Sequence, residues 1–168
     1  MQENELKRAA LLIKAPELEV SSHVEQLAKR LKELEKESEK MRLAFILQDI
    51  DKILSAAKDV HGVKIVTHVF ANATMDILRK VCDTIKQKSK SAVIVLGSQL
   101  PQEAHLLIAV TDDVIAKGLS AGELIKEIAP LMGGSGGGRP QMAQAGSKSP
   151  EKILSAVERA GQLIKGKL

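Results

Sequence analysis

The sequence predicts an α/β protein in which a long N-terminal coiled-coil-like helix precedes a small α/β globular subdomain with a glycine-rich loop. Apolar residues in the first third of the chain recur at alternating spacings of three and four, the pattern of a helix that pairs with another. Farther along, short β-branched runs alternate with helical stretches, and residues 133–146 hold six glycines. We therefore expect a helical coiled-coil subdomain over residues 1–60 and a globular α/β subdomain over residues 61–168.

The long helix is expected to begin at Pro16, which suits a first helical turn, and to run to Asp59. Its apolar seam consists of Val24, Leu27, Leu31, Leu34, Met41 and Phe45. At about 1.5 Å per residue, such a helix is on the order of 65 Å long, more than a subdomain of roughly 100 residues can cover. Either a second copy of the helix buries the seam, which predicts a homodimer, or the short segment 6–14 folds back on it.

The last part of this helix carries a broader apolar stripe than the seam does. The stripe consists of Leu43, Ile46, Leu47, Ile50, Ile53, Leu54 and Ala57. A broad stripe indicates that this end packs on a globular body rather than only on a partner helix.

The globular subdomain is expected to open with a strand over residues 63–70, after His61-Gly62 has ended the long helix. Thr74 then caps a helix over residues 75–88. The only cysteine, Cys82, lies on the apolar stripe of that helix, so we expect it to be a small core residue.

Two apolar strands follow, one over residues 92–96 that Gly97-Ser98 closes, and one over residues 106–110. Runs this apolar indicate strands that are covered on both faces. Residues 120–123 have the spacing of a capping box and open a helix, and Ser149-Pro150 opens the closing helix.

The glycine-rich segment reads Gly-Gly-Ser-Gly-Gly-Gly-Arg-Pro-Gln-Met-Ala-Gln-Ala-Gly. One interpretation is a loop whose bare N–H groups meet a phosphate or an RNA backbone, with Arg139 as a fixed charge. The other is a flexible linker, because a glycine string is costly to order. The spacing matches neither a P-loop nor the dinucleotide-binding fingerprint.

The positive charge is concentrated at the C-terminal end. The chain carries a net charge of +4, and residues 133–168 hold six basic residues against two acidic ones. This favours a polyanionic partner, although a solvated basic helix would have the same composition. With only two aromatic residues, recognition of folded RNA by shape is favoured over base stacking. The candidate nucleic-acid contacts are Gly136, Gly137, Gly138, Arg139, Gln144, Lys148, Lys152 and Arg159.

No catalytic or metal-binding constellation is recognisable. The four histidines, His23, His61, His68 and His105, lack the spacing of metal ligands, and a single cysteine excludes an intramolecular disulfide. We therefore expect no catalytic residue, no metal and no cofactor. The sequence shows no apolar run of the roughly 18 residues that span a bilayer and no signal-peptide pattern, which predicts a cytoplasmic protein without a membrane partner.

The glycine-rich segment resembles the signature of the C-terminal domain of alanyl-tRNA synthetases, a domain related to the C-terminal domain of DHH phosphoesterases. The elements Arg139-Pro140 and Ala143-Gln144-Ala145 carry the resemblance to the synthetases. It extends over nearly the whole chain, and the charged N-terminal helix resembles the coiled linker that follows the editing domain of that family. Where the family continues with a further glycine, this chain has Ser147.

The resemblance implies a non-catalytic tRNA-binding and dimerisation domain. It implies contact with the elbow of tRNA, which helps aminoacylation and editing to act on one tRNA. The implied partners are tRNA, specifically tRNA-Ala, a second copy of the chain, and the catalytic and editing domains of the parent synthetase. The alternative is a coiled-coil interaction scaffold with weak or incidental nucleic-acid binding. A remnant hydrolase is a third possibility, for which no nucleophile, base or metal cluster can be named.

Overall fold

The computed structural model describes residues 2–168, with side chains from residue 4 onward. The chain divides into two compact units, one that ends at Met41 and one that comprises Arg42–Leu168. The second unit therefore includes the broad apolar stripe that the sequence assigned to the end of the long helix.

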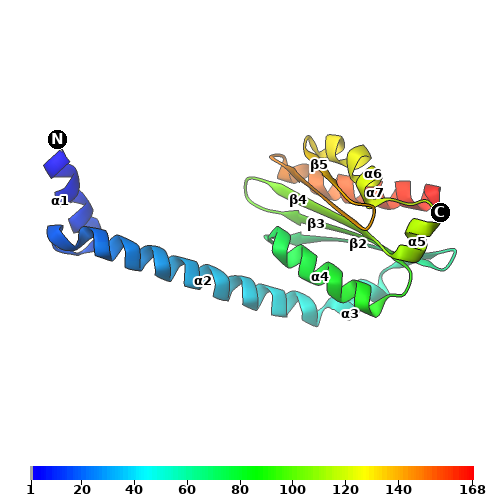
Figure 1. Ribbon diagram of the computed structural model, residues 1–168, viewed down its shortest axis with the longest axis horizontal. Helices are drawn as coiled ribbons and strands as arrows, with labels where there is room; N and C mark the ends of the chain where they lie inside the picture. The colour runs from blue at the N-terminus through cyan, green and yellow to red at the C-terminus, as the bar shows by residue number, and fades with distance from the viewer. Residues whose placement is uncertain (1) are drawn as a thin grey trace. The chain divides into compact units, whose positions relative to one another are not determined.

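The first unit consists of α1 (Gln2–Ile13), the short 3-10 helix η1 (Glu17–Glu19) and most of α2 (Val20–Gln48) (Figure 1). The predicted long N-terminal helix is confirmed as α2, but its predicted bounds, Pro16 to Asp59, are wrong. Pro16 precedes a 3-10 turn, and α2 ends at Gln48 because Asp49, with φ −96° and ψ 5°, leaves the α-helical conformation. The chain then resumes as α3 (Ile50–Ser55).

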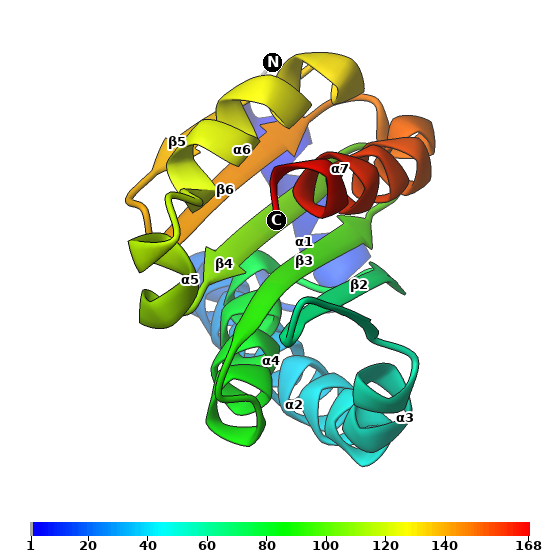
Figure 2. The same cartoon turned by 90° about the vertical axis from the view of Figure 1, so that its right-hand side faces the viewer.

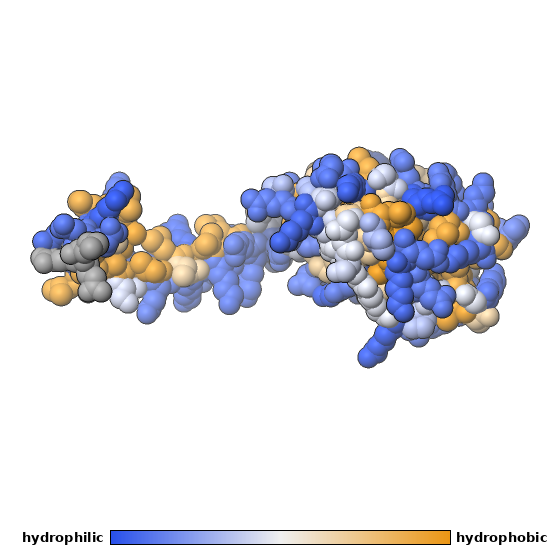
Figure 3. Space-filling model, turned by 90° about the horizontal axis from the view of Figure 1, so that it is seen from above, coloured by the Kyte–Doolittle hydropathy of each residue, from blue (hydrophilic) through white to orange (hydrophobic). Residues whose placement is uncertain are grey.

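The predicted seam of α2 is solvent-accessible. Its six apolar side chains, from Val24 to Phe45, are between 50% and 67% exposed. Figure 3 shows apolar side chains gathered along the helical unit. Helix α1 therefore leaves the seam accessible to a partner, although Ala10 itself is buried.

The broad stripe packs on the globular body, as the sequence predicted. Ile46, Ile50 and Ile53 are buried in one core together with Val66 and Phe70 of the sheet. The stripe therefore belongs to a packed core, whereas the seam residues are exposed.

A mixed sheet of six strands forms the centre of the second unit. Its spatial order is β1-β2-β3-β4-β6-β5, and β2 and β3 are the parallel pair while the other pairs are antiparallel. The strands are β1 (Lys58–Val60), β2 (Val63–Ala71), β3 (Ala92–Gln99), β4 (Ala104–Val110), β5 (Ser135–Gly138) and β6 (Met142–Ser147).

Helices cover the two faces of this sheet unevenly (Figure 2). On one face lie α3 and α4 (Met75–Lys88), and on the other lie α6 (Ala121–Ile128) and α7 (Ile153–Lys167). Strands β3 and β4 are buried on both faces, as their apolar runs predicted. Shorter helical pieces connect these elements: α5 (Asp112–Ala116), η2 (Ala129–Met132) and η3 (Pro150–Lys152).

Local signals placed most helix starts correctly. Thr74 caps α4, with its hydroxyl accepting a hydrogen bond from the backbone N–H of Ile77 at 3.4 Å. Ser120 occupies the N-cap position of α6, but its side chain makes no capping hydrogen bond, so the predicted capping box is not formed.

Two predicted breaks are wrong because the chain uses those residues inside the sheet. His61-Gly62 does not end a helix; both residues have positive φ and form the tight turn between β1 and β2, where Asp59 accepts a hydrogen bond from the Gly62 N–H. Gly97-Ser98 does not close β3, which continues to Gln99. Glycine is required at position 97 because a Cβ there would lie 2.8 Å from Ile153 of α7.

The glycine-rich segment is a β-hairpin, so both the predicted loop and the flexible linker are wrong. Strand β5 pairs with β6 from Ser135 opposite Gly146 to Gly138 opposite Ala143. An added Cβ at Gly134, Gly136 or Gly138 would come within 2.4 Å of the backbone of β6. Alternate glycines are therefore needed because the two strands approach closely, whereas Gly137 would place a Cβ in open space.

This difference between neighbouring glycines gives a test of the hairpin. We expect Gly136→Ala to lower the free energy of unfolding by roughly 1–3 kcal/mol through overpacking. Gly137→Ala, the matched control one residue away, should change it by less than about 0.5 kcal/mol. Urea unfolding of the original chain and of the two variants measures both changes in the free energy of unfolding. Equal effects of the two substitutions would contradict the hairpin geometry.

Cys82 is buried in the core beneath α4, as predicted. Burial raises the pKa of its thiol to about 12. We therefore expect a thiol reagent at pH 8 to label the native chain far more slowly than the urea-unfolded chain, whose thiol has a pKa of about 8.5. Because the native state keeps a proton that the unfolded state loses, Cys82 should also reduce stability as the pH rises above about 8.5. Rapid labelling of the native chain would place Cys82 outside the core.

Candidate nucleic-acid interface

The β5–β6 hairpin has two chemically different faces. On one face, Ala143 and Ala145 of β6 are buried in the core that contains α6 and α7, opposite Gly138 and Gly136. Because side chains alternate along a strand, Gly137 lies on the other face together with its partner Gln144 and with Gly146. A Cβ at Gly137 or Gly146 would meet no atom within 4 Å. This second face, which we call the glycine face, thus presents bare backbone.

Side chains of α4 border the glycine face. Arg79 donates a hydrogen bond from Nη2 to Oε1 of Gln144 at 2.6 Å, and from Nη1 to Oδ1 of Asp76 at 3.0 Å. Its side chain remains 45% exposed. Two turns farther along α4, the Lys86 ammonium donates to the backbone carbonyl of Gln141 at 3.5 Å. Arg79 is therefore held in a fixed orientation beside the hairpin while it stays accessible to a ligand.

Sequence analysis missed both of these basic residues. Arg79 and Lys86 are separated from Gln144 by more than 50 positions, and α4 showed only an ordinary amphipathic pattern. Their spacing of seven, which places them on one face of a helix, was the one available signal.

Excess positive charge is found both along α4 and at the ends of the hairpin. Helix α4 carries four basic residues, Arg79, Lys80, Lys86 and Lys88, against the two acidic residues Asp76 and Asp83. Arg139 lies in the turn between β5 and β6, and Lys148 directly follows β6 at the opposite end. A strand of six residues spans about 20 Å, so these two charges bracket the glycine face.

The remaining predicted basic residues lie elsewhere. Lys152 stands near the start of the hairpin, where its ammonium would lie 3.7 Å from a Cβ at Gly133. Arg159 is on α7, which packs on β2 and β3 from the opposite side of the sheet, and it donates to Gln162 at 3.4 Å. The structure thus brings Gln144 and the glycines together, places Arg139, Lys148 and Lys152 at the hairpin ends, and leaves Arg159 apart.

His105 adds a titratable group beside the glycine face, opposite Gly146 in the strand register. Its Nε2 lies 3.3 Å from a carboxylate oxygen of Glu103, and its side chain is 21% exposed. Within the described part of the chain, its buried Nδ1 has no hydrogen-bond partner. One imidazole without a nucleophile or metal partner provides a polar contact rather than a reaction centre.

The described residues form neither a metal site of clustered side chains nor a membrane-spanning helix. No group of three or more His, Cys, Asp or Glu side chains among them could hold a metal ion. None of the helices that they form combines the length and apolar character needed to cross a bilayer.

Residues 62–166 match the family described as the DHHA1 domain. The chain is 40% identical over 157 residues to an alanine–tRNA ligase of Alkaliphilus metalliredigens, covering 94% of this chain and 18% of the ligase. It is 38% identical over 167 residues to an alanine–tRNA ligase of Pelotomaculum thermopropionicum, covering 99% and 19%. The chain thus spans about a fifth of these curated relatives.

Among solved structures, the chain is similar to the C-Ala domain from Aquifex aeolicus alanyl-tRNA synthetase. The two share 28% sequence identity and superpose with a TM-score of 0.59, over 66% of this chain and 98% of that domain.

Proposed function

This chain belongs to the DHHA1 domain family, and from that premise we propose that it is a non-catalytic tRNA-binding domain of an alanyl-tRNA synthetase. Its globular part binds the elbow of tRNA-Ala and helps aminoacylation and editing to act on one tRNA. Its partners are that tRNA, a second copy of the chain, and the catalytic and editing domains of the parent synthetase. It acts in the cytoplasm.

The glycine face is the observation that supports RNA binding most directly. Bare backbone at Gly137 and Gly146 lets an RNA strand approach the sheet closely at these two positions. Strand β5 also forms the edge of the sheet, so part of its backbone N–H groups lie outside the ladder. Such N–H groups are suited to phosphate oxygens.

Charge placement supports a backbone lying along the hairpin. Arg139 and Lys148 at its two ends attract phosphates, while Arg79 and Gln144 offer hydrogen-bond donors between them. Lys152 extends the positive end near Gly133. Arg159, on the opposite side of the sheet, would contact RNA only as a separate point of attachment. This arrangement favours recognition of the shape of a folded RNA over the reading of bases.

The exposed seam of α2 supports a second role, self-association through the long helix. Six apolar side chains that are at least half exposed at helical spacing form a surface that a second copy can bury. In the scaffold alternative, this seam is the main functional surface and RNA binding is incidental.

Titration with RNA tests the tRNA proposal. We expect the chain to bind a folded tRNA more tightly than the same RNA when it is unfolded. Measured at two salt concentrations, the affinity for the folded tRNA should be lower at the higher concentration. Gly137→Glu, which places a carboxylate on the glycine face, should weaken binding at least about tenfold because it repels phosphate. Lys117→Gln removes an exposed charge after α5 and is the matched control. Its affinity for the folded tRNA should stay within about twofold of that of the original chain.

Arg139→Ala tests the contribution to RNA binding of the charge at the hairpin end, separately from that of the glycine face. Loss of one phosphate contact should reduce the slope of log K against log salt by roughly 0.7 to 0.9. If its affinity and salt slope match those of the original chain, Arg139 is not a contact. Equal binding of folded and unfolded RNA would favour the scaffold alternative.

Sedimentation equilibrium tests the seam. We expect a dimer at micromolar concentration, and a monomer for the double variant Leu27→Lys/Leu34→Lys, because two charges in an apolar seam are costly to bury. Glu33→Gln changes the charge of the same helix outside the seam and should leave the dimer intact. A monomeric parent chain would exclude self-association while leaving RNA binding open.

A further inference from the structure

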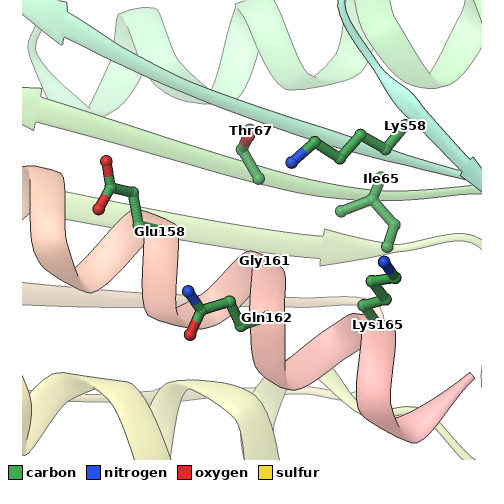
Figure 4. A pocket seen from close by; sticks show the side chains of 7 residues that line it. All are labelled: Lys58, Ile65, Thr67, Glu158, Gly161, Gln162 and Lys165. Atoms are coloured by element: carbon green, nitrogen blue, oxygen red, sulfur yellow. The ribbon is translucent and has the colours of Figure 1, made fainter.

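A polar pocket opens at the edge of the sheet far from the hairpin, between β1, β2 and α7 (Figure 4). Its volume of about 410 Å³ is within the range of small-ligand sites. Thr67 of β2 and Gly161 of α7 form its floor, where a Cβ at position 161 would lie 3.3 Å from the Thr67 methyl group. Glycine at this point of α7 therefore keeps the floor open.

Two lysines from different elements share this pocket. Lys58 comes from β1 and Lys165 from α7, and Figure 4 shows the Lys58 ammonium directed toward Thr67 and the Lys165 ammonium toward Ile65. Neither ammonium has a hydrogen bond or an ion pair with any residue that the structure describes. Two like charges that face one cavity repel each other, and an anion between them removes that repulsion.

The other polar side chains of the pocket include neutral donors that suit an oxyanion. Thr67 and Gln162 also line the cavity and carry neutral donors, and the Gln162 amide is directed away from Lys165 (Figure 4). The one carboxylate of the lining, on Glu158, lies apart from both lysines (Figure 4). A lysine ammonium binds phosphate as a compact point charge. Hydroxyl and amide groups can donate further hydrogen bonds to the phosphate oxygens. A polar lining of this kind does not suit an apolar ligand.

We propose that this pocket binds a phosphate group, held by Lys58 and Lys165 with Thr67 and Gln162 as neutral donors. It is a second site, on the α7 side of the sheet at the β1 edge, and it does not depend on RNA binding at the glycine face. The phosphate comes either from an RNA backbone or from a free phosphate or phosphate monoester. The shared chemistry is an oxyanion with at least two negative or hydrogen-bonding oxygens.

Amide chemical shifts of the isotope-labelled 168-residue chain test this proposal with inorganic phosphate, at constant ionic strength maintained with chloride. We expect saturable shifts at Thr67, Gly161 and Gln162. Lys58→Gln and Lys165→Gln should each weaken phosphate binding by about tenfold, the size expected for a lost charged hydrogen bond. Lys167→Gln, on the same helix and paired with Glu127, is the matched control and should leave the affinity unchanged.

The source of the phosphate is decided by two further titrations, with adenosine monophosphate and with folded tRNA. If Lys58→Gln and Lys165→Gln weaken tRNA binding, the RNA backbone occupies the pocket; if they weaken only phosphate and monophosphate binding, the ligand is free. Spectra of the variants that match the parent outside the pocket establish that they are folded. Shifts that do not saturate, that chloride reproduces, or that persist equally in both variants would overturn the proposal.

Discussion

Burial of nearly every residue of β3 and β4 between two helical layers is the constraint on which the rest of the second unit depends. Both faces of these strands are apolar, so helices must cover each face, and α4 on one side and α6 with α7 on the other supply that cover. The edge strands β1 and β5 are mostly exposed. The sheet is therefore left with two incompletely covered edges, and each carries a candidate binding surface: the glycine face at β5–β6 and the lysine pocket at β1–β2.

The glycines of the hairpin serve two purposes that composition alone does not separate. Gly134, Gly136 and Gly138 lack side chains because β6 leaves no room for them, which is a requirement of the sheet itself. Gly137 and Gly146 have room for a side chain and carry none. Only the second pair points to a ligand, because internal packing already accounts for the first set. The rigid ladder also removes the entropic cost that a flexible glycine loop would incur on binding.

Much of the fold could be predicted from local sequence patterns. The errors of this prediction arise where segments that are distant in the sequence meet. The amphipathic period of the sequence correctly predicted helix α4 and the burial of Cys82. It also correctly predicted that the stripe containing Ile53 packs in the core. The hairpin was missed because a run of glycines has no β-propensity, and its register depends on the partner strand. Gly97 was taken as a strand end because its packing against Ile153 is a long-range contact. Arg79 was not predicted as a residue of the site for the same reason, since only the folded sheet brings it to Gln144.

Binding of RNA on the glycine face of the hairpin is tested most directly by mapping amide chemical shifts on addition of folded tRNA. We expect the amides of Gly137 and Gly146 to shift in proportion to the bound fraction, together with those of Gln144 and the Arg139 turn. If the chain becomes saturated with tRNA while the Gly137 and Gly146 amides remain unchanged, the RNA binds elsewhere and the proposed interface is wrong.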